Sequence, residues 1–410
     1  MKRQTIQSKQ HAKLRRTFAR QLFILVVPFC FITVWLVASF RKIGCVNCNL
    51  PQIHPTKTVQ QDLASFKDNT KEAKQLTTAQ WKPMFLETNS SKFTAEHLWS
   101  QSLSTDAVIL GPQIRSNHTL VTAYFRAKSK YPSTKYDEWM QNMMSLKDPL
   151  VIFTQPDLVE MMSNLRSDPS LSTIIIPCTL EDLPISKLKS DLVFEHAGKT
   201  LSLWEHQLEI DPEKNRHSSY YVFWIWLSKS WLVEQAIQRN FFQSEFFVYT
   251  DIGCFRGGKY NHKMLVSPDF WSSSIRPDRH TLLWMAHHPP NPPPTYIWTN
   301  KLKQKQFFYQ SGSQAAGFRE AWIEFNREFA KTLDDYVAAG VFVGEDQCIL
   351  QATCLRKPQL CQYIPFSQVA DNHYFGLRHV LHFPTLNKMQ EPYQPWRPPQ
   401  PSADFLVSSE

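Results

Sequence analysis

The chain has 410 residues, of which 42% are hydrophobic, so it can bury the core of one large domain or of two modest ones. Its formal net charge of +9 at pH 7 arises within the first 42 residues, which contain nine basic residues and no acidic one. The rest of the chain is balanced. Because a nucleic-acid-binding surface needs a basic surplus on the folded part, this distribution argues against a nucleic-acid partner.

A continuous apolar segment occupies residues 21–40, which include no charged side chain. A helix of this length spans about 30 Å of hydrocarbon, so the segment predicts a transmembrane helix. Seven basic residues precede it, which predicts a cytosolic basic tail over residues 1–20 and a lumenal position for the rest of the chain. A cleaved signal peptide is the alternative, but the apolar run exceeds the usual length of such peptides. We therefore expect a signal-anchored, single-pass type II protein of the Golgi or ER membrane.

Cysteines and glycosylation sequons agree with a lumenal position. Seven of the eight cysteines follow the apolar segment, and Asn-x-Ser/Thr sequons predict glycosylation at Asn89 and Asn117. An odd number of lumenal cysteines leaves one thiol free or paired between chains. Cys45 and Cys48 lie close to the membrane without a second Cys pair, which favours an intermolecular disulfide over a zinc site. This pattern predicts a disulfide-linked homodimer.

Two regions of unusual composition flank the expected domain. Residues 41–116 are rich in Thr, Gln, Lys and Ser, which predicts a stalk between membrane and domain. Residues 391–410 begin with a proline cluster that is incompatible with a helix or a central strand, so we expect a Pro-rich tail there. The lumenal domain is accordingly assigned to residues 117–390.

The first half of this domain alternates between strand and helix patterns. Residues 118–125, 149–154 and 173–177 are runs of β-branched and aromatic side chains. Helical patterns over about 134–146 and 157–165 separate them. A βαβαβ series of this kind predicts a parallel sheet with helices on both faces.

The pattern resumes in the second half. Residues 220–239 read as a helix that leads into a strand at 246–250, and residues 307–310 read as a further strand. After Gly317, aromatic residues recur at helical spacing until Gly340, which is placed to end a helix. The predicted fold class is α/β, with a mostly parallel, Rossmann-like sheet sandwiched between helices.

Asp251 stands directly after the strand at 246–250. In open α/β sheets, ligands bind beyond the carboxyl ends of the strands, so a polar residue there is a candidate site residue. Gly253 permits a tight turn, and Arg256 is within reach of an anion bound at this end. Turn capping by Asp251 is the alternative. The long aromatic strand favours a position inside a crevice.

Several known chemistries leave no signature in the sequence. There is no GxGxxG after the first strand, no P-loop, no GxSxG elbow and no HExxH helix. A membrane-tethered lumenal α/β domain without these motifs is most economically explained as a user of sugar nucleotides.

Seven short motifs carry a resemblance to a known family. They are VTAYF at 121–125, YDEWM at 136–140, PLVIFT at 149–154, SKSWLVEQAI at 228–237, FFVYTDIGCFR at 246–256, AAGFREAW at 315–322 and EDQCIL at 345–350. In this order they resemble the HtrL/YibB family, which is similar to a distant branch of the GT-A glycosyltransferases. The resemblance extends over residues 119–383. It implies a GT-A-like fold that transfers sugar from a nucleotide-sugar donor to a glycan or glycoprotein hydroxyl.

The resemblance also implies a metal site, with a departure from the usual motif. GT-A enzymes commonly hold Mn²⁺ or Mg²⁺ with Asp-x-Asp at the end of a central strand, whereas this chain has Asp251-Ile252-Gly253 and lacks the second carboxylate. The implied ligands are Asp251 and His373, the latter in a His-x-x-Gly sequence. Lys229 and Arg256 are the alternative source of positive charge for a departing nucleoside diphosphate.

Further roles follow from the same resemblance. Asp346 and Gln347 match an Asp-Gln element in which the acid faces the acceptor and orients or deprotonates its hydroxyl. Capping a helix that begins near Cys348 is the alternative role for Asp346. We expect the backbone at Gly312 and Gly317 to approach the donor sugar.

Arg126 is expected to contact phosphate or base at the end of the first strand. The missing second carboxylate leaves a different class of function open, that of a catalytically inactive lectin or scaffold protein of the secretory pathway.

Overall fold

The computed structural model describes residues 82–85, 94–128, 131–196, 198–256, 264–286, 310–371, 375–387 and 389–398. All of these ranges belong to one compact unit, residues 79–410. Some predicted features lie outside the described residues: the anchor at 21–40, Cys45, Cys48, Asn89 and His373. Within the described ranges, no helix has both the length and the apolar character needed to cross a membrane.

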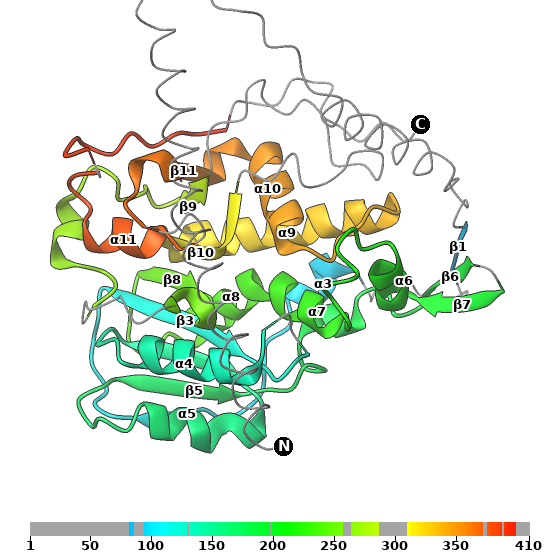
Figure 1. Ribbon diagram of the computed structural model, residues 1–410, viewed down its shortest axis with the longest axis horizontal. Helices are drawn as coiled ribbons and strands as arrows, with labels where there is room; N and C mark the ends of the chain where they lie inside the picture. The colour runs from blue at the N-terminus through cyan, green and yellow to red at the C-terminus, as the bar shows by residue number, and fades with distance from the viewer. Residues whose placement is uncertain are drawn as a thin grey trace, which may run out of the picture. The chain divides into compact units, whose positions relative to one another are not determined.

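Eight strands of the described chain form the central sheet, in the order β11-β9-β10-β8-β3-β4-β5-β2 (Figure 1). They are β2 (Val108–Leu110), β3 (His118–Tyr124), β4 (Leu150–Thr154), β5 (Thr173–Pro177), β8 (Phe246–Thr250), β9 (Leu282–Ala286), β10 (Gln310–Phe318) and β11 (Cys361–Pro365). Strands β8, β3, β4 and β5 are parallel, whereas β10 is antiparallel to both of its neighbours. Strand β11 is parallel to β9, and β2 is antiparallel to β5. This large, mostly parallel sheet confirms the predicted α/β class.

Helices cover both faces of this sheet. They are α3 (Ala95–Trp99), α4 (Ser133–Met144), α5 (Val159–Leu165), α6 (Leu203–Glu209), α7 (Tyr221–Leu227), α8 (Lys229–Arg239), α9 (Arg319–Ala338), α10 (Asp346–Arg356) and α11 (Leu377–His382). Val151 and Phe153 of β4 share a core with α3 and α6 to α10, whereas Leu150 and Ile152 share a core with α4, α5 and α11. Successive strand residues point to opposite faces, so burial on both faces explains the continuous apolar runs.

A smaller sheet lies apart from the central one. In it, β6 (Leu192–His196) pairs with β7 (Lys199–Ser202) on one side and with β1 (Lys82–Phe85) on the other. Helix α6 follows β7 directly, and Ser202 caps it with a side chain that accepts a hydrogen bond from the Glu205 N–H. The capping box of this helix is complete, because the Glu205 carboxylate also accepts from the Ser202 N–H.

The predicted helix at 220–239 is two helices. Helix α7 ends at Leu227 and α8 begins at Lys229, with Ser228 between them. The apolar pattern continues across this junction, so periodicity alone could not reveal the break. The break makes Lys229 the first residue of a helix.

The predicted strand at 307–310 is confirmed at Gln310, where β10 begins, and residues 307–309 lie outside the described part of the chain. The strand then runs through Gly312 and Gly317, whose backbone was expected to approach the donor sugar. Strand β10 pairs with β8 from Gln314 to Phe318, and its register with β9 shifts between Gln310 and Ala315, so Gly312 lies in an irregular stretch of the strand.

The domain begins earlier than predicted, because residues 94–116 belong to it and not to a stalk. Leu98 and Trp99 of α3 are buried, and β2 pairs with β5. The indole Nε1 of Trp231 donates to the Gln101 carbonyl at 3.1 Å. The polar average composition of residues 41–116 conceals α3, β2 and the earlier strand β1, which pairs with β6.

The domain also ends later than predicted. Tyr393 is buried, and Trp396 forms an antiparallel bridge with Tyr363 of β11. The Tyr363 N–H donates to the Trp396 carbonyl at 2.7 Å, and the Trp396 N–H returns a bond to Tyr363 at 2.8 Å. Prolines are tolerated beside an edge strand, so this segment packs against the end of the sheet.

Candidate functional site

The order of the central strands defines a ligand-binding position. The chain passes from β3 to β4 and β5 on one side, and β8 then joins on the other side of β3. Such a reversal creates a crevice at the carboxyl ends of the two strands, where open α/β sheets bind ligands. Asp251 follows β8 at this end, and Arg126 follows β3.

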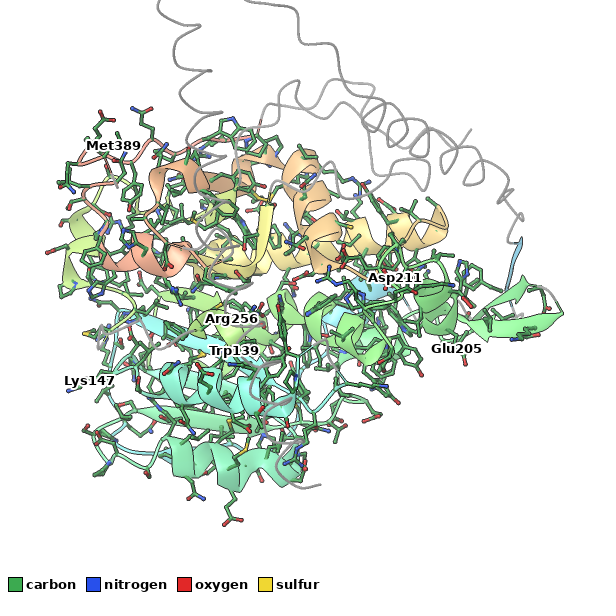
Figure 2. All side chains as sticks on the ribbon, viewed as in Figure 1. Trp139, Lys147, Glu205, Asp211, Arg256 and Met389 are labelled. Atoms are coloured by element: carbon green, nitrogen blue, oxygen red, sulfur yellow. A yellow bond between two sulfur atoms is a disulfide. The ribbon has the colours of Figure 1, made fainter. Side chains whose placement is uncertain are left out.

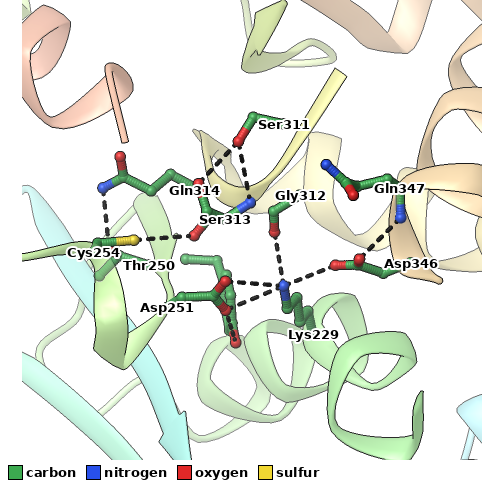
Figure 3. A network of polar contacts seen from close by, with 11 residues as sticks. Lys229, Thr250, Asp251, Cys254, Ser311, Gly312, Ser313, Gln314, Asp346 and Gln347 are labelled. Carbon is green, nitrogen blue, oxygen red and sulfur yellow. Dashed lines mark hydrogen bonds and ion pairs between the residues drawn. The ribbon is translucent and has the colours of Figure 1, made fainter. Parts of the chain in front are cut away.

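The ammonium of Lys229 lies at the centre of a buried polar cluster (Figure 3). Its Nζ atom is 3.1 Å from Asp251 Oδ1 and 2.7 Å from Asp346 Oδ2. It also donates to the carbonyl oxygen of Gly312 at 2.8 Å. We call Lys229, Asp251, Gly312 and Asp346 the lysine cluster. It joins α8, the end of β8, β10 and α10.

Exposure differs sharply between the two carboxylates of the cluster. The side chain of Asp251 is 33% exposed, whereas that of Asp346 is 7% exposed and that of Lys229 is 8% exposed. Asp251 is therefore the carboxylate that a ligand can reach from solvent. Asp346 and Lys229 lie beneath it.

Two helix N-termini place the buried charges. Asp346 is the first residue of α10, and its Oδ1 accepts the Gln347 N–H at 2.9 Å. A carboxylate is favoured at this end of the helix dipole, but a lysine such as Lys229 in the first turn of α8 is disfavoured. The two acidic partners therefore stabilise Lys229 in a position that its own helix opposes. The helix begins at Asp346 and not near Cys348, with Glu345 at the N-cap position, so Asp346 is a residue of its first turn that still accepts a backbone N–H.

Charge interactions reinforce this arrangement. Burial would lower the pKa of Lys229, but the carboxylates of Asp251 and Asp346 outweigh it and raise that pKa above its ordinary value. Burial raises the pKa of Asp346, and Lys229 opposes the rise. The lysine is therefore charged at neutral pH.

Gly312 is needed where it stands because of the cluster. A Cβ atom on this residue would lie 2.7 Å from Asp346 Oδ2 and 3.0 Å from Gln347 Cγ. The backbone at Gly312 thus closely approaches the carboxylate of Asp346, whereas the sequence had predicted a close approach to a donor sugar. Gln347 lies beside it and donates from Nε2 to the Gln310 carbonyl at 3.2 Å.

Tyr249 is a member of the site that sequence reasoning missed. Its hydroxyl donates to Asp251 Oδ1 at 3.1 Å, and the Asp251 N–H donates to the Ser313 carbonyl at 2.9 Å. Burial and the nearby Asp251 raise the pKa of Tyr249, so it remains a donor. The available signal was its position two residues before Asp251, on the strand face that α8 covers.

Arg256 lies beside Trp139 near the same end of β8 (Figure 2), and two further aromatic rings complete a cage around its guanidinium. Its guanidinium carbon is 4.1 Å from the centre of the Trp139 ring, 5.0 Å from Tyr131 and 4.8 Å from Phe375. Its Nε donates to the Gly253 carbonyl at 2.9 Å. Among the described residues, no carboxylate pairs with Arg256, so its charge is available to an anion.

Two predicted site residues lie apart from the cluster. Arg126 is exposed and pairs with Asp157, with its Nη1 2.7 Å from Oδ2. Gly317 is at the opposite end of β10, beside Phe247, where a Cβ would collide with Leu282. This position corrects the expectation that Gly317 lies near a donor sugar. His373 lies outside the described residues.

The described residues of the cluster do not fit a divalent cation. No group of three or more His, Cys, Asp or Glu side chains in the described part of the chain is arranged to hold a metal ion. Both oxygens of Asp251 face the Lys229 ammonium, at 3.1 Å and 3.2 Å. The Lys229 ammonium would repel a metal ion bound to Asp251.

Comparisons with known proteins place these residues within a family. A family model described as "Bacterial protein of unknown function (HtrL_YibB)" matches residues 116–373, well over half of the chain. The chain belongs to the HtrL_YibB family. The matched range includes all four residues of the lysine cluster, so the cluster lies within the part that defines this HtrL_YibB protein.

The comparisons of the HtrL_YibB protein with curated proteins and with solved structures do not narrow its function further. No curated protein matches it. Among solved structures, mouse xyloside xylosyltransferase 1 in its apo form is similar at a TM-score of 0.29 and 9% identity. That match covers 60% of this chain and 83% of the mouse chain.

A second group of ionisable side chains adjoins the cluster of the HtrL_YibB protein. Glu345 precedes Asp346, and burial, with Glu213 and Asp346 nearby, raises the pKa of Glu345 to about 7. His217 opposes this rise, and its Nδ1 lies 2.7 Å from Asp211 Oδ2. A carboxyl group that changes charge near neutral pH therefore stands next to the buried aspartate.

Proposed function

We propose that the protein is a glycosyltransferase that moves a sugar from a nucleotide-sugar donor to a hydroxyl of a glycan or glycoprotein. The observation that carries this proposal is the pair of carboxylates, Asp251 and Asp346, held by Lys229 at the carboxyl end of β8. This is the position at which an open α/β sheet binds a ligand. The motif resemblance to GT-A glycosyltransferases gives the reaction class.

The two carboxylates take different roles in this proposal. Asp251 is accessible and meets the reacting hydroxyl, which it orients or deprotonates. Asp346 is buried and fixes Lys229, whose ammonium in turn donates to the Gly312 carbonyl. Tyr249 and Lys229 both donate to the Asp251 carboxylate, which keeps its orientation for the substrate.

Arg256 supplies positive charge for the leaving nucleoside diphosphate. Three aromatic rings hold its guanidinium in place, and its Nε bond to Gly253 ties it to the turn that follows Asp251. A cation positioned before the reaction stabilises developing negative charge without reorganisation. We therefore assign the diphosphate to Arg256.

The cellular setting of the proposal rests on the sequence. Residues 21–40 would anchor a type II protein in the Golgi or ER membrane, and Cys45 and Cys48 would link two copies. A disulfide between Cys354 and Cys361 supports an oxidising compartment, where such bonds persist. Asn117 is exposed before β3, at the end of the strand opposite Asp251, and a glycan there would leave the crevice open.

Nucleotide binding is the first test. The full-length protein, purified in a mild detergent, is heated with UDP, GDP, CDP or ADP. A ligand at 100 times its Kd stabilises the folded state by about 2.7 kcal/mol, so a shift of a few degrees in Tm is expected for the correct nucleotide. Asp251→Ala and Asp346→Ala should then abolish donor hydrolysis. If none of these nucleoside diphosphates shifts the Tm, the proposed glycosyltransferase activity is refuted.

One observation favours a second function, that of a sugar-binding protein without catalysis. Lys229 holds both carboxylates at hydrogen-bonding distance, so neither is a free base in this conformation. Such a protein would bind a glycan and turn over no donor. Glycan-array binding that persists in Asp251→Ala, with no sugar transfer by the wild type, would identify this function.

A further inference from the structure

Oxygens of three protein residues surround the Lys229 ammonium. Asp251 and Gly312 accept hydrogen bonds from it, and Asp346 Oδ2 forms an ion pair with it at 2.7 Å. The N···O distances run from 2.7 to 3.2 Å. Hydrogen bonds have such lengths, whereas Ca²⁺ and Mg²⁺ bind oxygen at about 2.0–2.6 Å. The oxygen cage has the dimensions of an ammonium site.

The same cage has the chemistry that a hard cation prefers. Carboxylate and backbone carbonyl oxygens are the ligands of Mg²⁺ and Ca²⁺ in proteins. Here the ammonium of Lys229, from α8, occupies the space between these oxygens. The Gly312 carbonyl can approach this closely because glycine lacks the Cβ that would collide with Asp346.

Charge balance gives the ammonium a function. Asp251 and Asp346 carry two negative charges, and Lys229 and Arg256 carry two positive charges. The four groups are therefore neutral together, and an incoming diphosphate meets no net repulsion. Without Lys229, the same rim would be anionic and would need a metal before it could accept a phosphate.

We propose that Lys229 is the resident cation of this site and that the protein binds its donor without a divalent metal. The identity of the donor as a nucleotide sugar rests on the proposed function, but the claim about the metal does not. Lys229 is a positioning residue here, because oxygens of three protein residues hold its ammonium.

A titration with Mn²⁺ alone tests the inference without any nucleotide. Free Mn²⁺ is measured by electron paramagnetic resonance in the presence of the full-length protein. The wild type should show no saturable Mn²⁺ binding at Asp251, so Asp251→Asn should leave its titration curve unchanged. Lys229→Ser should leave the oxygen cage open and bind Mn²⁺ at least tenfold more tightly than the wild type. Lys147→Ser, which removes an exposed lysine, is the matched control and should behave as the wild type.

The outcomes separate cleanly. Saturable Mn²⁺ binding by the wild type that Asp251→Asn abolishes would overturn the inference, as would a folded Lys229→Ser variant that gains none. If Lys229→Ser does not fold, the wild type decides: its nucleotide-induced shift in Tm should be equal in EDTA and in Mn²⁺, and a shift seen only with Mn²⁺ would overturn the inference. If no nucleotide binds, the proposed function fails, and the titration of the wild type against Asp251→Asn still answers the metal question.

Discussion

Lys229 Nζ lies 2.7 Å from Asp346 Oδ2, although the two residues are the first positions of two different helices. A lysine is unfavourable at a helix N-terminus, and a buried carboxylate is unfavourable without a cation. Each residue therefore occupies its position because of the other. This mutual dependence makes the pair the most sensitive point of the candidate site.

Replacement of Lys229 by Met should destabilise the protein strongly. It leaves Asp346 buried and Asp251 without its cation, and removal of one partner from a buried ion pair typically costs about 3 kcal/mol or more. Urea unfolding at pH 7 measures the loss. The destabilisation should shrink at low pH, where the two carboxyls become protonated. Lys147→Met, on the surface, should change stability by less than about 0.5 kcal/mol, and equal effects for the two variants would contradict the buried pair.

Replacement of Gly312 by Ala should destabilise the fold by about 1–3 kcal/mol, the usual cost of overpacking. The new Cβ would lie 2.7 Å from Asp346 Oδ2. The control is the same change in an Asp346→Ala background, which removes the colliding oxygen. The second cost should be clearly smaller than the first, as measured by a double-mutant cycle of unfolding free energies. Additive costs would place the strain elsewhere.

The sequence predicted the centre of the sheet better than its edges. Strands β5 and β8 are apolar runs of five residues buried on both faces, and such runs can be recognised in the sequence. Strand β9 is a similar run, LLWMA, that was not recognised, because a short apolar run does not distinguish a strand from a buried helix. Helix α3 and strand β2 were missed because their stability comes from partners far away in the chain.

The candidate site was predictable where a topological rule applied. Asp251 was identified because it follows a buried strand, and the structure places it at the reversal of strand order. Lys229 was a candidate as an alternative source of positive charge for a diphosphate, and its contact with Asp346 links residues 117 positions apart, which no local pattern encodes. The role of Gly312 follows from a collision that exists only in three dimensions.

Glu345 should make stability depend on pH near neutrality. Burial raises its pKa from 4.5 to about 7, so between these values the folded state binds more protons than the unfolded state. Stability attributable to this group therefore falls as pH rises from about 4.5 to 7. Glu345→Gln stays neutral, so the variant should gain on the wild type across this window, by on the order of 2 kcal/mol at pH 8 after allowance for solvent screening. Urea unfolding at pH 4.5, 6 and 8 measures the difference. A constant difference at all three values would rule out the proposed titration.

Arg256 and Arg126 should differ in their contribution to nucleotide binding. Arg256 is caged by aromatic rings and has no acidic partner in the described structure, whereas Arg126 already pairs with Asp157 at the surface. A charge-assisted hydrogen bond contributes about 1.5–3 kcal/mol, so Arg256→Met should weaken binding of the nucleoside diphosphate by tenfold or more. Arg126→Met should weaken it by less than threefold. Isothermal titration calorimetry of both variants measures the effect. The reverse ranking would move the diphosphate from the end of β8 to the end of β3.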